Sequence, residues 1–233
     1  MNDVIMKCSG LTKEYGALRA LNNVDLEFKK GRIIGLLGPN GSGKTTFIKI
    51  LNGLLAPTSG EVTIGDFPIG IETKKIVSYL SDCITLPQWM KIREIVDFYA
   101  GFFEDFNKQK AAEMIDNLKL DMNSTFKNLS KGNKEKVQLV LVMSREAKLY
   151  LLDEPMGGVD PATRDYILNT IISNYSEDSA VVISTHLISD IEKVLDEVIF
   201  IDRGDIVLND TVDNIRENQN KSVDALFREV FKC

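Results

Sequence analysis

The sequence has little cysteine, no long apolar run and no excess of positive charge, and each of these absences narrows the function. Its three cysteines (Cys8, Cys83 and Cys233) are far apart and lack metal-ligand spacing, which indicates reduced cytosolic thiols rather than a disulfide framework. No apolar run approaches the ~18 residues of a membrane span, and the N-terminus lacks a basic-then-apolar leader. The net charge of −6 argues against nucleic acid as a primary partner. A role at a membrane would therefore require a partner that holds the protein there.

What is present describes one globular domain over residues 1–233, with no internal repeat and no low-complexity linker. Apolar periodicity divides the chain into strands and helices. The predicted strands lie at 3–8, 24–28, 33–37, 61–64, 76–80, 149–152, 180–185, 198–202 and 205–208. A helical segment is inserted at about 83–147. A last helix at about 222–233 carries an apolar stripe, which we expect to dock on its own domain.

The strongest motif is a glycine-rich turn between a strand-length apolar run and a helix-compatible sequence. The pattern G-x-x-x-x-G-K-[ST] falls on Gly38, Gly43, Lys44 and Thr45, in the strand–turn–helix context of a phosphate-binding loop. Glycines let the N–H groups of the loop approach phosphate oxygens. Lys44 would supply a charge to the β- and γ-phosphates, and the Thr45 hydroxyl can bind Mg²⁺. The flanking strand and helix disfavour the alternative, an ordinary glycine-rich turn.

Two acidic residues stand at the end of the buried strand 149–152. Asp153 and Glu154 follow four apolar residues, and ligands of open parallel sheets bind beyond the carboxyl ends of the strands. Buried acids are costly unless something pairs with them, and Mg²⁺ bound to ATP would do so. We expect Asp153 to hold the metal, directly or through water, and Glu154 to polarise the attacking water. Two solvated carboxylates are the alternative.

The only histidine, His186, follows the predicted strand 180–185. We expect it at the same sheet edge as the two acids, where a neutral imidazole could hydrogen-bond a γ-phosphate and the attacking water. A structural histidine is the alternative. Asp160 lies between the predicted strands 149–152 and 180–185. We expect it to cap a helix whose first residue is Pro161.

Two weaker signals have ordinary structural explanations. Tyr15 lies in the segment 11–16 between two predicted strands and could stack on a nucleotide base, although a packed loop tyrosine is favoured from this segment alone. The turn 128–133 precedes a helix-patterned stretch and could offer the Ser130 hydroxyl and backbone N–H groups to an anion. A plain helix N-cap is the default explanation there.

The order of these pieces resembles the ATP-binding subunit of ABC transporters, and the match spans nearly the whole chain. The resemblance implies an α/β fold with a P-loop NTPase core, a mainly parallel sheet, an N-terminal antiparallel β-subdomain and an inserted helical subdomain. Tyr15 sits at the position of the adenine-stacking aromatic residue, and the run 38–46 at that of the Walker A loop. The strand ending in Asp153 and Glu154 matches Walker B, Asp160 the D-loop aspartate and His186 the switch histidine.

The resemblance also implies the ligands and partners of the protein. The nucleotide-binding residues it implies are Tyr15, Gly38, Pro39, Asn40, Gly41, Ser42, Gly43, Lys44, Thr45 and Thr46, with Thr45 and Asp153 on Mg²⁺. In this family two ATPase subunits, identical or related, sandwich two ATP molecules. Ser130 and Gly132 of the signature sequence would then contact ATP held by the other subunit. A separate transmembrane permease would hold the dimer on the cytoplasmic face of the membrane.

Two stretches depart from the family pattern. In the signature, usually Leu-Ser-Gly-Gly-Gln, Lys131 and Asn133 replace a glycine and the glutamine. In the family, a second glutamine contacts Mg²⁺ and relays to the membrane subunit. In this chain the corresponding position is occupied by Asp82, and Gln88 lies six residues further on as the alternative. An aspartate beside a triphosphate would repel it unless a cation lay between them. We therefore expect Asp82 to be held off the γ-phosphate and to reach the metal through a water at most.

The sequence thus predicts an ATP-hydrolysing ABC transporter subunit, in a short form that looks most like bacterial exporter ATPases. Import is the alternative direction of transport. One rival is a soluble ABC ATPase acting on ribosomes or DNA, although such relatives usually carry two cassettes or a long coiled coil, which this chain lacks. Another rival is a nucleotide-binding regulatory module that does not hydrolyse ATP. Glu154 and His186 argue against that module, whereas Asp82 keeps it open.

Overall fold

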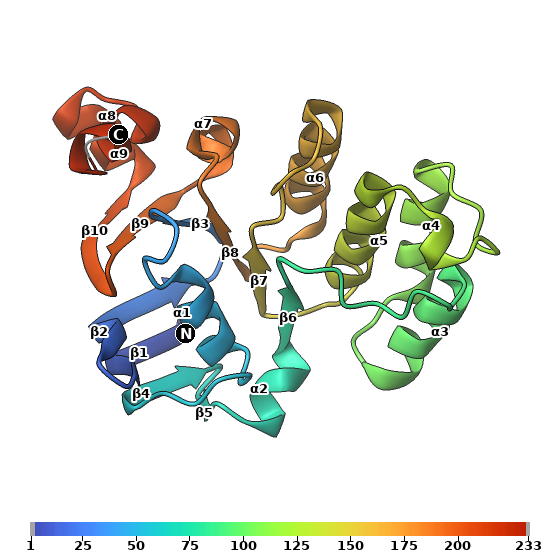
Figure 1. Ribbon diagram of the computed structural model, residues 1–233, viewed down its shortest axis with the longest axis horizontal. Coiled ribbons are helices and arrows are strands. Elements are labelled where there is room, and N and C mark those ends of the chain that lie inside the picture. Colours follow the sequence, from blue (N-terminus) through green and yellow to red (C-terminus); the bar gives the residue numbers. More distant parts are fainter. Residues whose placement is uncertain (1–2, 232–233) are drawn as a thin grey trace.

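Two β-sheets, one antiparallel and one mainly parallel, form the centre of the protein (Figure 1). The computed structural model describes residues 3–231. The smaller sheet has the strand order β2-β1-β4-β5, and its pairings are antiparallel. The larger has the order β10-β9-β3-β8-β7-β6, with parallel pairings except at its β10 edge. These two sheets confirm the predicted fold class.

The bounds of the strands follow the sequence patterns closely in the larger sheet. The smaller sheet contains β1 (Val4–Tyr15), β2 (Leu18–Lys29), β4 (Ser59–Ile64) and β5 (Phe67–Pro68). The larger sheet contains β3 (Arg32–Leu37), β6 (Val77–Leu80), β7 (Leu149–Asp153), β8 (Ala180–Thr185), β9 (Glu197–Asp202) and β10 (Asp205–Thr211).

The first two strands are much longer than the sequence predicted, and this corrects the position of Tyr15. We expected strands at 3–8 and 24–28 with a loop at 11–16, but Tyr15 is the last residue of β1. The pairing of β1 with β2 shifts register between Cys8 and Leu11 and again between Leu11 and Lys13. Such β-bulges break the alternation of apolar and polar residues, so the pattern concealed the second half of the strand.

Helices cover both faces of the larger sheet and form a separate group at one end (Figure 1). Those of eight or more residues are α1 (Lys44–Leu51), α3 (Ile92–Phe102), α4 (Lys108–Asn117), α5 (Lys131–Met143), α6 (Pro161–Asn174), α8 (Val212–Gln219) and α9 (Val223–Phe231). The shorter ones are α2 (Ile71–Ile76), α7 (Ile188–Ile191) and the 3-10 turns η1 (Phe126–Asn128) and η2 (Glu192–Val194). The helices α3 to α5 lie between β6 and β7 in the chain. Within the described residues, no helix is long and apolar enough to cross a membrane.

The central strands are apolar on both faces because each face packs on a different core. In β7, Leu149 and Leu151 belong to the core shared with α1 and the antiparallel sheet. Tyr150 and Leu152 belong to the core beneath α5, α6 and α7. Parallel strands buried on both faces read as continuous apolar runs. This burial rigidly positions the carboxyl ends of β3, β7 and β8, where the candidate site lies.

The final helix docks on its own domain, as its apolar stripe predicted. Phe227 and Phe231 of α9 pack against Phe200 of β9, with ring centroids 5.4 and 5.9 Å away. Val223 and Leu226 are buried in the same core. The last two residues of the predicted helix, including Cys233, lie outside the described residues.

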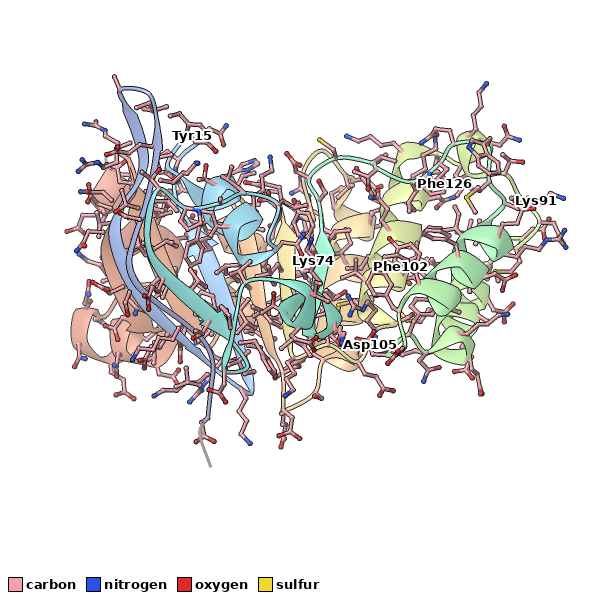
Figure 2. All side chains as sticks on the ribbon, turned by 90° about the horizontal axis from the view of Figure 1, so that it is seen from below. Tyr15, Lys74, Lys91, Phe102, Asp105 and Phe126 are labelled. Carbon is pink, nitrogen blue, oxygen red and sulfur yellow. The ribbon has the colours of Figure 1, made fainter. Side chains whose placement is uncertain are left out.

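A buried arginine joins the helical segment to the sheet. The Arg145 guanidinium donates to the Asp105 carboxylate at 2.9 and 3.0 Å and to the carbonyls of Val77 and Lys75, each at 2.6 Å. It also stacks over the Phe103 ring at 3.9 Å. Figure 2 shows Asp105 at this junction, below α2 and beside the helical segment. One side chain therefore ties together three separate stretches of backbone.

We predict that Arg145→Ala will lower the free energy of unfolding by about 3 kcal/mol, because it leaves Asp105 and two carbonyls without their buried partner. Urea denaturation would measure the loss. Arg228→Ala is the matched control, since Arg228 forms a mostly exposed pair with Asp224 (2.9 Å), and should cost at most about 1 kcal/mol. Equal losses in the two variants would contradict the assignment of Arg145 as the junction.

Candidate active site

A cavity of about 480 Å³ opens over the loop between β3 and α1 and beside the carboxyl ends of β6 and β7. Its lining comes from segments far apart in the chain. It is lined by Tyr15, Leu18, Ala20, Asn40, Gly41, Ser42, Gly43, Lys44, Thr45, Thr46, Asp82 and Glu154. The structure thus brings together Tyr15, most of the phosphate-loop residues and one of the two predicted acids.

Both ends of the loop 38–43 require glycine because the backbone passes close to other strands. A Cβ atom on Gly38 would lie 2.2 Å from the Ile201 carbonyl oxygen, and one on Gly43 would lie 2.5 Å from the Ala20 carbonyl oxygen. Gly43 also has a φ of 116°, in the region that favours glycine. No side chain caps α1, which starts at Lys44. The N–H groups of its first turn are therefore open to an anion.

The Lys44 side chain is buried and folds back over the loop. Its ammonium donates to the carbonyls of Gly38 (2.7 Å) and Pro39 (3.0 Å), which explains why these two residues support the cavity without lining it. Burial lowers the pKa of Lys44, and the charges of Glu154 and Asp153 oppose this shift. The ammonium is thus held between the loop and the acids, where a phosphate would stabilise its charge.

Asp153 lies fully buried at the end of β7, beside the start of α1. Its Oδ1 accepts hydrogen bonds from the hydroxyls of Thr45 (3.2 Å) and Ser184 (2.6 Å). Its Oδ2 is buried and has no partner. Burial raises the pKa of Asp153, the two hydroxyls lower it, and the nearby charges of Asp82 and Glu154 raise it further. A buried carboxylate oxygen without a donor, next to a threonine hydroxyl, fits a bound cation.

The two residues predicted to act on water face each other. His186 Nδ1 lies 3.0 Å from Glu154 Oε2, and the imidazole is about half exposed. Glu154 has a φ of 48°, which is unusual for a residue with a side chain. Its N–H donates to the backbone oxygen (3.1 Å) and the hydroxyl (3.0 Å) of Ser184. These two bonds hold the carboxylate of Glu154 at the rim of the cavity.

Ser184 is the residue that the sequence analysis missed. It binds Asp153 and the backbone of Glu154 together, so it fixes the two acids relative to each other. The signal for it was present in the sequence: a serine and a threonine, Ser184 and Thr185, end a run of apolar residues in β8. Buried hydroxyls at the carboxyl end of a central strand need a partner, and the neighbouring strand supplies it.

Tyr15 and Leu18 form the end of the cavity away from the acids. Tyr15 is 47% exposed, and Leu18 is the second large exposed apolar side chain there. The Lys13 ammonium lies 5.1 Å from the centre of the Tyr15 ring. Figure 2 shows Tyr15 at the side of the molecule opposite the helical segment. An exposed ring at the mouth of a cavity can stack on a planar base.

The cavity receives Asp82 and not Gln88. Asp82 is exposed, and its Oδ1 accepts a hydrogen bond from the Ser81 hydroxyl at 3.1 Å. Gln88 is also exposed, but its amide donates to the Leu86 carbonyl (3.3 Å) and it does not line the cavity. Of these two side chains, the one that lines the cavity is therefore a carboxylate, and its match to the family glutamine stays a prediction.

The signature residues lie away from this cavity. Ser130 caps α5 by accepting from the Asn133 N–H (3.2 Å), and Asp160 caps α6 by accepting from the Thr163 N–H (3.0 Å). The helix α1 packs against β2 and β7, whereas α5 packs against α6 and β6. Figure 1 shows α5 across β6 and β7 from α1. Gly132 and Ser130 do not line the cavity, so one copy does not bring these predicted residues together with Lys44.

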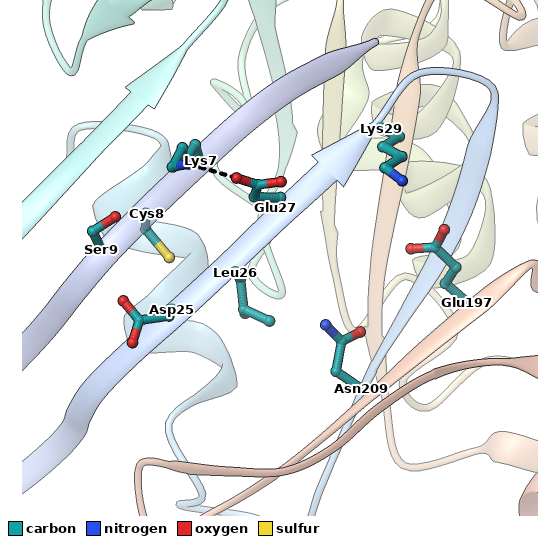
Figure 3. Close-up of a pocket in the computed structure, with 9 residues that line it drawn as sticks. All are labelled: Lys7, Cys8, Ser9, Asp25, Leu26, Glu27, Lys29, Glu197 and Asn209. Atoms are coloured by element: carbon teal, nitrogen blue, oxygen red, sulfur yellow. Dashed lines mark ion pairs between the residues drawn. The ribbon is translucent and has the colours of Figure 1, made fainter.

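A second cavity of about 480 Å³ lies between β1, β2 and the β9–β10 hairpin (Figure 3). All of its acidic side chains, and Lys7, already have partners within the protein, Glu197 through Arg32 at 3.6 Å. Lys7 pairs with Glu27 at 2.6 Å, and Asp25 accepts from the Gly10 N–H at 2.8 Å. The described residues that line it include no glycine loop and no helix start. The first cavity is therefore the candidate active site.

Comparison with known proteins identifies the family of this site. The family model for ABC transporters matches residues 21–157. The uncharacterized ABC transporter ATP-binding protein YdbJ of Bacillus subtilis (strain 168) is 30% identical over 232 residues, which are 96% of this chain and 74% of that protein. The linearmycin resistance ATP-binding protein LnrL of the same organism is 28% identical over 211 residues, 87% of this chain and 68% of that protein.

Solved structures share the fold. The structure of an ATP-binding subunit of an ABC transporter has a TM-score of 0.88 and 25% identity, and covers 97% of this chain and 99% of its own. A dimeric ATP-binding cassette in a post-hydrolysis state, bound to ADP and Pi, has a TM-score of 0.77 and 24% identity. That match covers 89% of this chain and 98% of the other. At this sequence identity the likeness shows that the two chains share a fold and nothing more.

We predict that Lys44→Ala will weaken binding of ATP in the presence of Mg²⁺ about tenfold or more, because a charge-assisted hydrogen bond to phosphate is lost. Isothermal titration of the purified chain would measure the affinity. Lys75→Ala is the control, since Lys75 is exposed and pairs with Glu72 (3.0 Å) far from the cavity lining. Unchanged affinity in Lys44→Ala would refute the role of the loop.

Proposed function

Since this chain belongs to the family of ABC transporter ATP-binding proteins, we propose that it drives a separate membrane subunit by hydrolysing ATP at sites shared between two ATPase subunits. The chain is an ATP-binding and ATP-hydrolysing subunit of a transporter. The observation that carries the proposal is the cavity in which Lys44, Glu154 and the phosphate loop meet. The side chains in and around this cavity divide into those that hydrolyse ATP, those that would hold Mg²⁺ and those that bind the nucleotide.

Glu154 and His186 form the hydrolytic pair. Glu154 accepts a proton from the attacking water as general base, and its neighbour His186, 3.0 Å away, orients that water and hydrogen-bonds the γ-phosphate. The strained backbone of Glu154 is held by Ser184, so the carboxylate is oriented before ATP arrives. This preorganisation supports the proposal that Glu154 takes part in hydrolysis.

Thr45 and Asp153 are the residues that would hold Mg²⁺. Their side chains are 3.2 Å apart, and Asp153 Oδ2 is buried without a donor. When bound, the metal would neutralise charge on the β- and γ-phosphates. Lys44 moves its ammonium from the loop carbonyls to phosphate oxygens, and the N–H groups of the loop and of α1 bind the remaining oxygens. Tyr15 stacks on the adenine.

A second ATPase subunit, identical or related, completes each site. The cavity of one copy contains no group from the start of α5, although Ser130 there has a hydroxyl hydrogen left to donate, since its oxygen accepts from Asn133. In a head-to-tail pair, Ser130 and Gly132 of one copy reach the ATP of the other. Asp160, at the start of α6 beside Gly132, communicates between the two sites.

The permease docks on a groove between the sheet and the helical segment. Adjacent cavities of about 350 and 300 Å³ share Leu54, Tyr79 and Tyr99 in their lining. Leu54 and Phe102 stand at this groove with 60% and 69% of their surfaces exposed. Figure 2 shows Phe102 facing the junction near Lys74. Exposed apolar residues around a groove are typical of a protein interface. Trp89 is also exposed (76%) but does not line these cavities.

Export is the direction we propose, and the cytoplasmic face of the membrane is the location. The relative LnrL is named for resistance to linearmycin, which fits removal of a compound from the cell. The signature sequence also resembles that of exporter ATPases. The permease, not this subunit, would select the transported substrate.

We predict that Glu154→Gln will lower ATP turnover by about 10²–10⁴-fold while ATP still binds, because the general base is lost and the shape is kept. With ATP trapped, the variant should shift from monomer to dimer in light scattering at high protein concentration. Glu177→Gln, a change at an exposed residue outside the cavity, is the control. Full turnover in Glu154→Gln would show that this chain hydrolyses ATP by other residues, or not in this cavity.

We predict that a photoreactive benzophenone side chain at Phe102, introduced in cells, will crosslink to an integral membrane protein, because Phe102 faces the permease. The same side chain at Phe67 is the matched control, since Phe67 is also an exposed phenylalanine (45%) but lies in the antiparallel sheet. Mass spectrometry would identify the crosslinked chain. Equal crosslinking at both positions, or crosslinks only to soluble proteins, would count against this surface.

A further inference from the structure

The cavity holds one acidic residue whose charge has no cationic partner among the described residues. Asp82 follows β6 and lines the cavity together with Lys44, Thr45 and Glu154. Its carboxylate accepts a hydrogen bond from the Ser81 hydroxyl at 3.1 Å and has a side-chain hydrogen bond with Cys83, and it forms no ion pair within residues 3–231. The Asp82 side chain is exposed to solvent.

The charged side chains that line the cavity are negative in sum, although the proposed ligand is an anion. Among the described residues of the lining, Lys44 is the one cationic side chain, against the carboxylates of Asp82 and Glu154, with Asp153 buried beside Thr45. The Lys44 ammonium is already shared with two loop carbonyls. A triphosphate that enters alone therefore meets more negative charge than positive charge.

The other two carboxylates are fixed by partners, whereas Asp82 is not. Glu154 is bonded to His186, and Asp153 Oδ1 accepts two hydroxyls. The charge of Asp82 acts on Asp153, since it is among the causes that raise the pKa of Asp153. Asp153 Oδ2 is fully buried and has no hydrogen-bond partner. This is a second, independent observation that indicates a cation site beside Thr45.

We propose that the Asp82 carboxylate makes nucleotide binding by this chain depend on a divalent cation, by repelling metal-free ATP and favouring the metal complex. The proposal rests on the proposed function, in which ATP occupies this cavity. Within residues 3–231, no three acidic, histidine or cysteine side chains are grouped closely enough to hold a metal by themselves. Phosphate oxygens must therefore complete the cation site, so the metal and the nucleotide bind as a unit.

The size of the effect depends on the position of the charge. Asp82 is exposed, so solvent screens its interaction with the phosphates. Removal of the charge should strengthen binding of metal-free ATP about five- to tenfold, and should change binding of Mg-ATP about twofold or less. The ratio of the two affinities is thus the quantity that Asp82 controls.

Isothermal titration of ATP into the full chain, once with excess EDTA and once with Mg²⁺, tests the proposal. In Asp82→Asn the ratio of the affinities with and without Mg²⁺ should fall about fivefold relative to the parent chain, chiefly because the affinity in EDTA rises. Asp82→Glu keeps the charge and should keep the parent ratio, which separates charge from loop shape. Asp66→Asn, at an exposed turn residue outside the cavity, should leave both affinities unchanged.

An equal ratio in the parent chain and in Asp82→Asn would overturn the proposal, and so would a reduced ratio in Asp82→Glu. Raised salt should shrink the difference between the parent chain and Asp82→Asn, since the interaction is between exposed charges. Failure of the parent chain to bind ATP even with Mg²⁺ would instead overturn the proposed function, so the two failures are distinguishable.

Discussion

One carboxylate oxygen holds the active site together. Oδ1 of Asp153 accepts the hydroxyls of Thr45, at the start of α1, and Ser184, at the end of β8. Ser184 in turn fixes the backbone of Glu154. The phosphate loop, the acid that we propose as a metal ligand and the acid that we propose as general base thus share one hydrogen-bonded network, which is anchored in strands buried on both faces. Such a buried network is stable only if its members are satisfied, and the unpaired Oδ2 of Asp153 marks where a cation would complete it.

The sequence predicted most of this fold and site because their signals are local. The loop 38–43 needs glycine at both ends, because a Cβ atom there would collide with the backbone of a neighbouring strand. The strands β7 and β8 must be continuously apolar, because both of their faces are covered. The features that the sequence did not predict depend on contacts between residues far apart in the chain, or on segments too short to show a period. The bulges of β1 concealed half a strand, α2 and α8 are too short and polar to show a clear period, and Ser184 acquires its role only from the neighbouring strand.

In the proposed function, the two halves of the site lie on different copies, and this separation couples ATP hydrolysis to the association of two copies. A copy with ATP in its cavity would have the proposed general base and the residues proposed to hold Mg²⁺, but neither Ser130 nor Gly132 of that copy lines the cavity with Lys44. Under the proposed function, turnover therefore waits for a second copy.

The claim that each site is shared between two copies is tested most directly by mixing two inactive variants. Lys44→Ala damages the phosphate loop, and Ser130→Asp keeps a good helix N-cap but sets a negative charge against the phosphate of the other copy. In a mixed dimer, Lys44 of one copy and Ser130 of the other make one intact site. The account predicts that the mixture hydrolyses ATP well above the sum of the separate variants. A mixture no more active than that sum would contradict it.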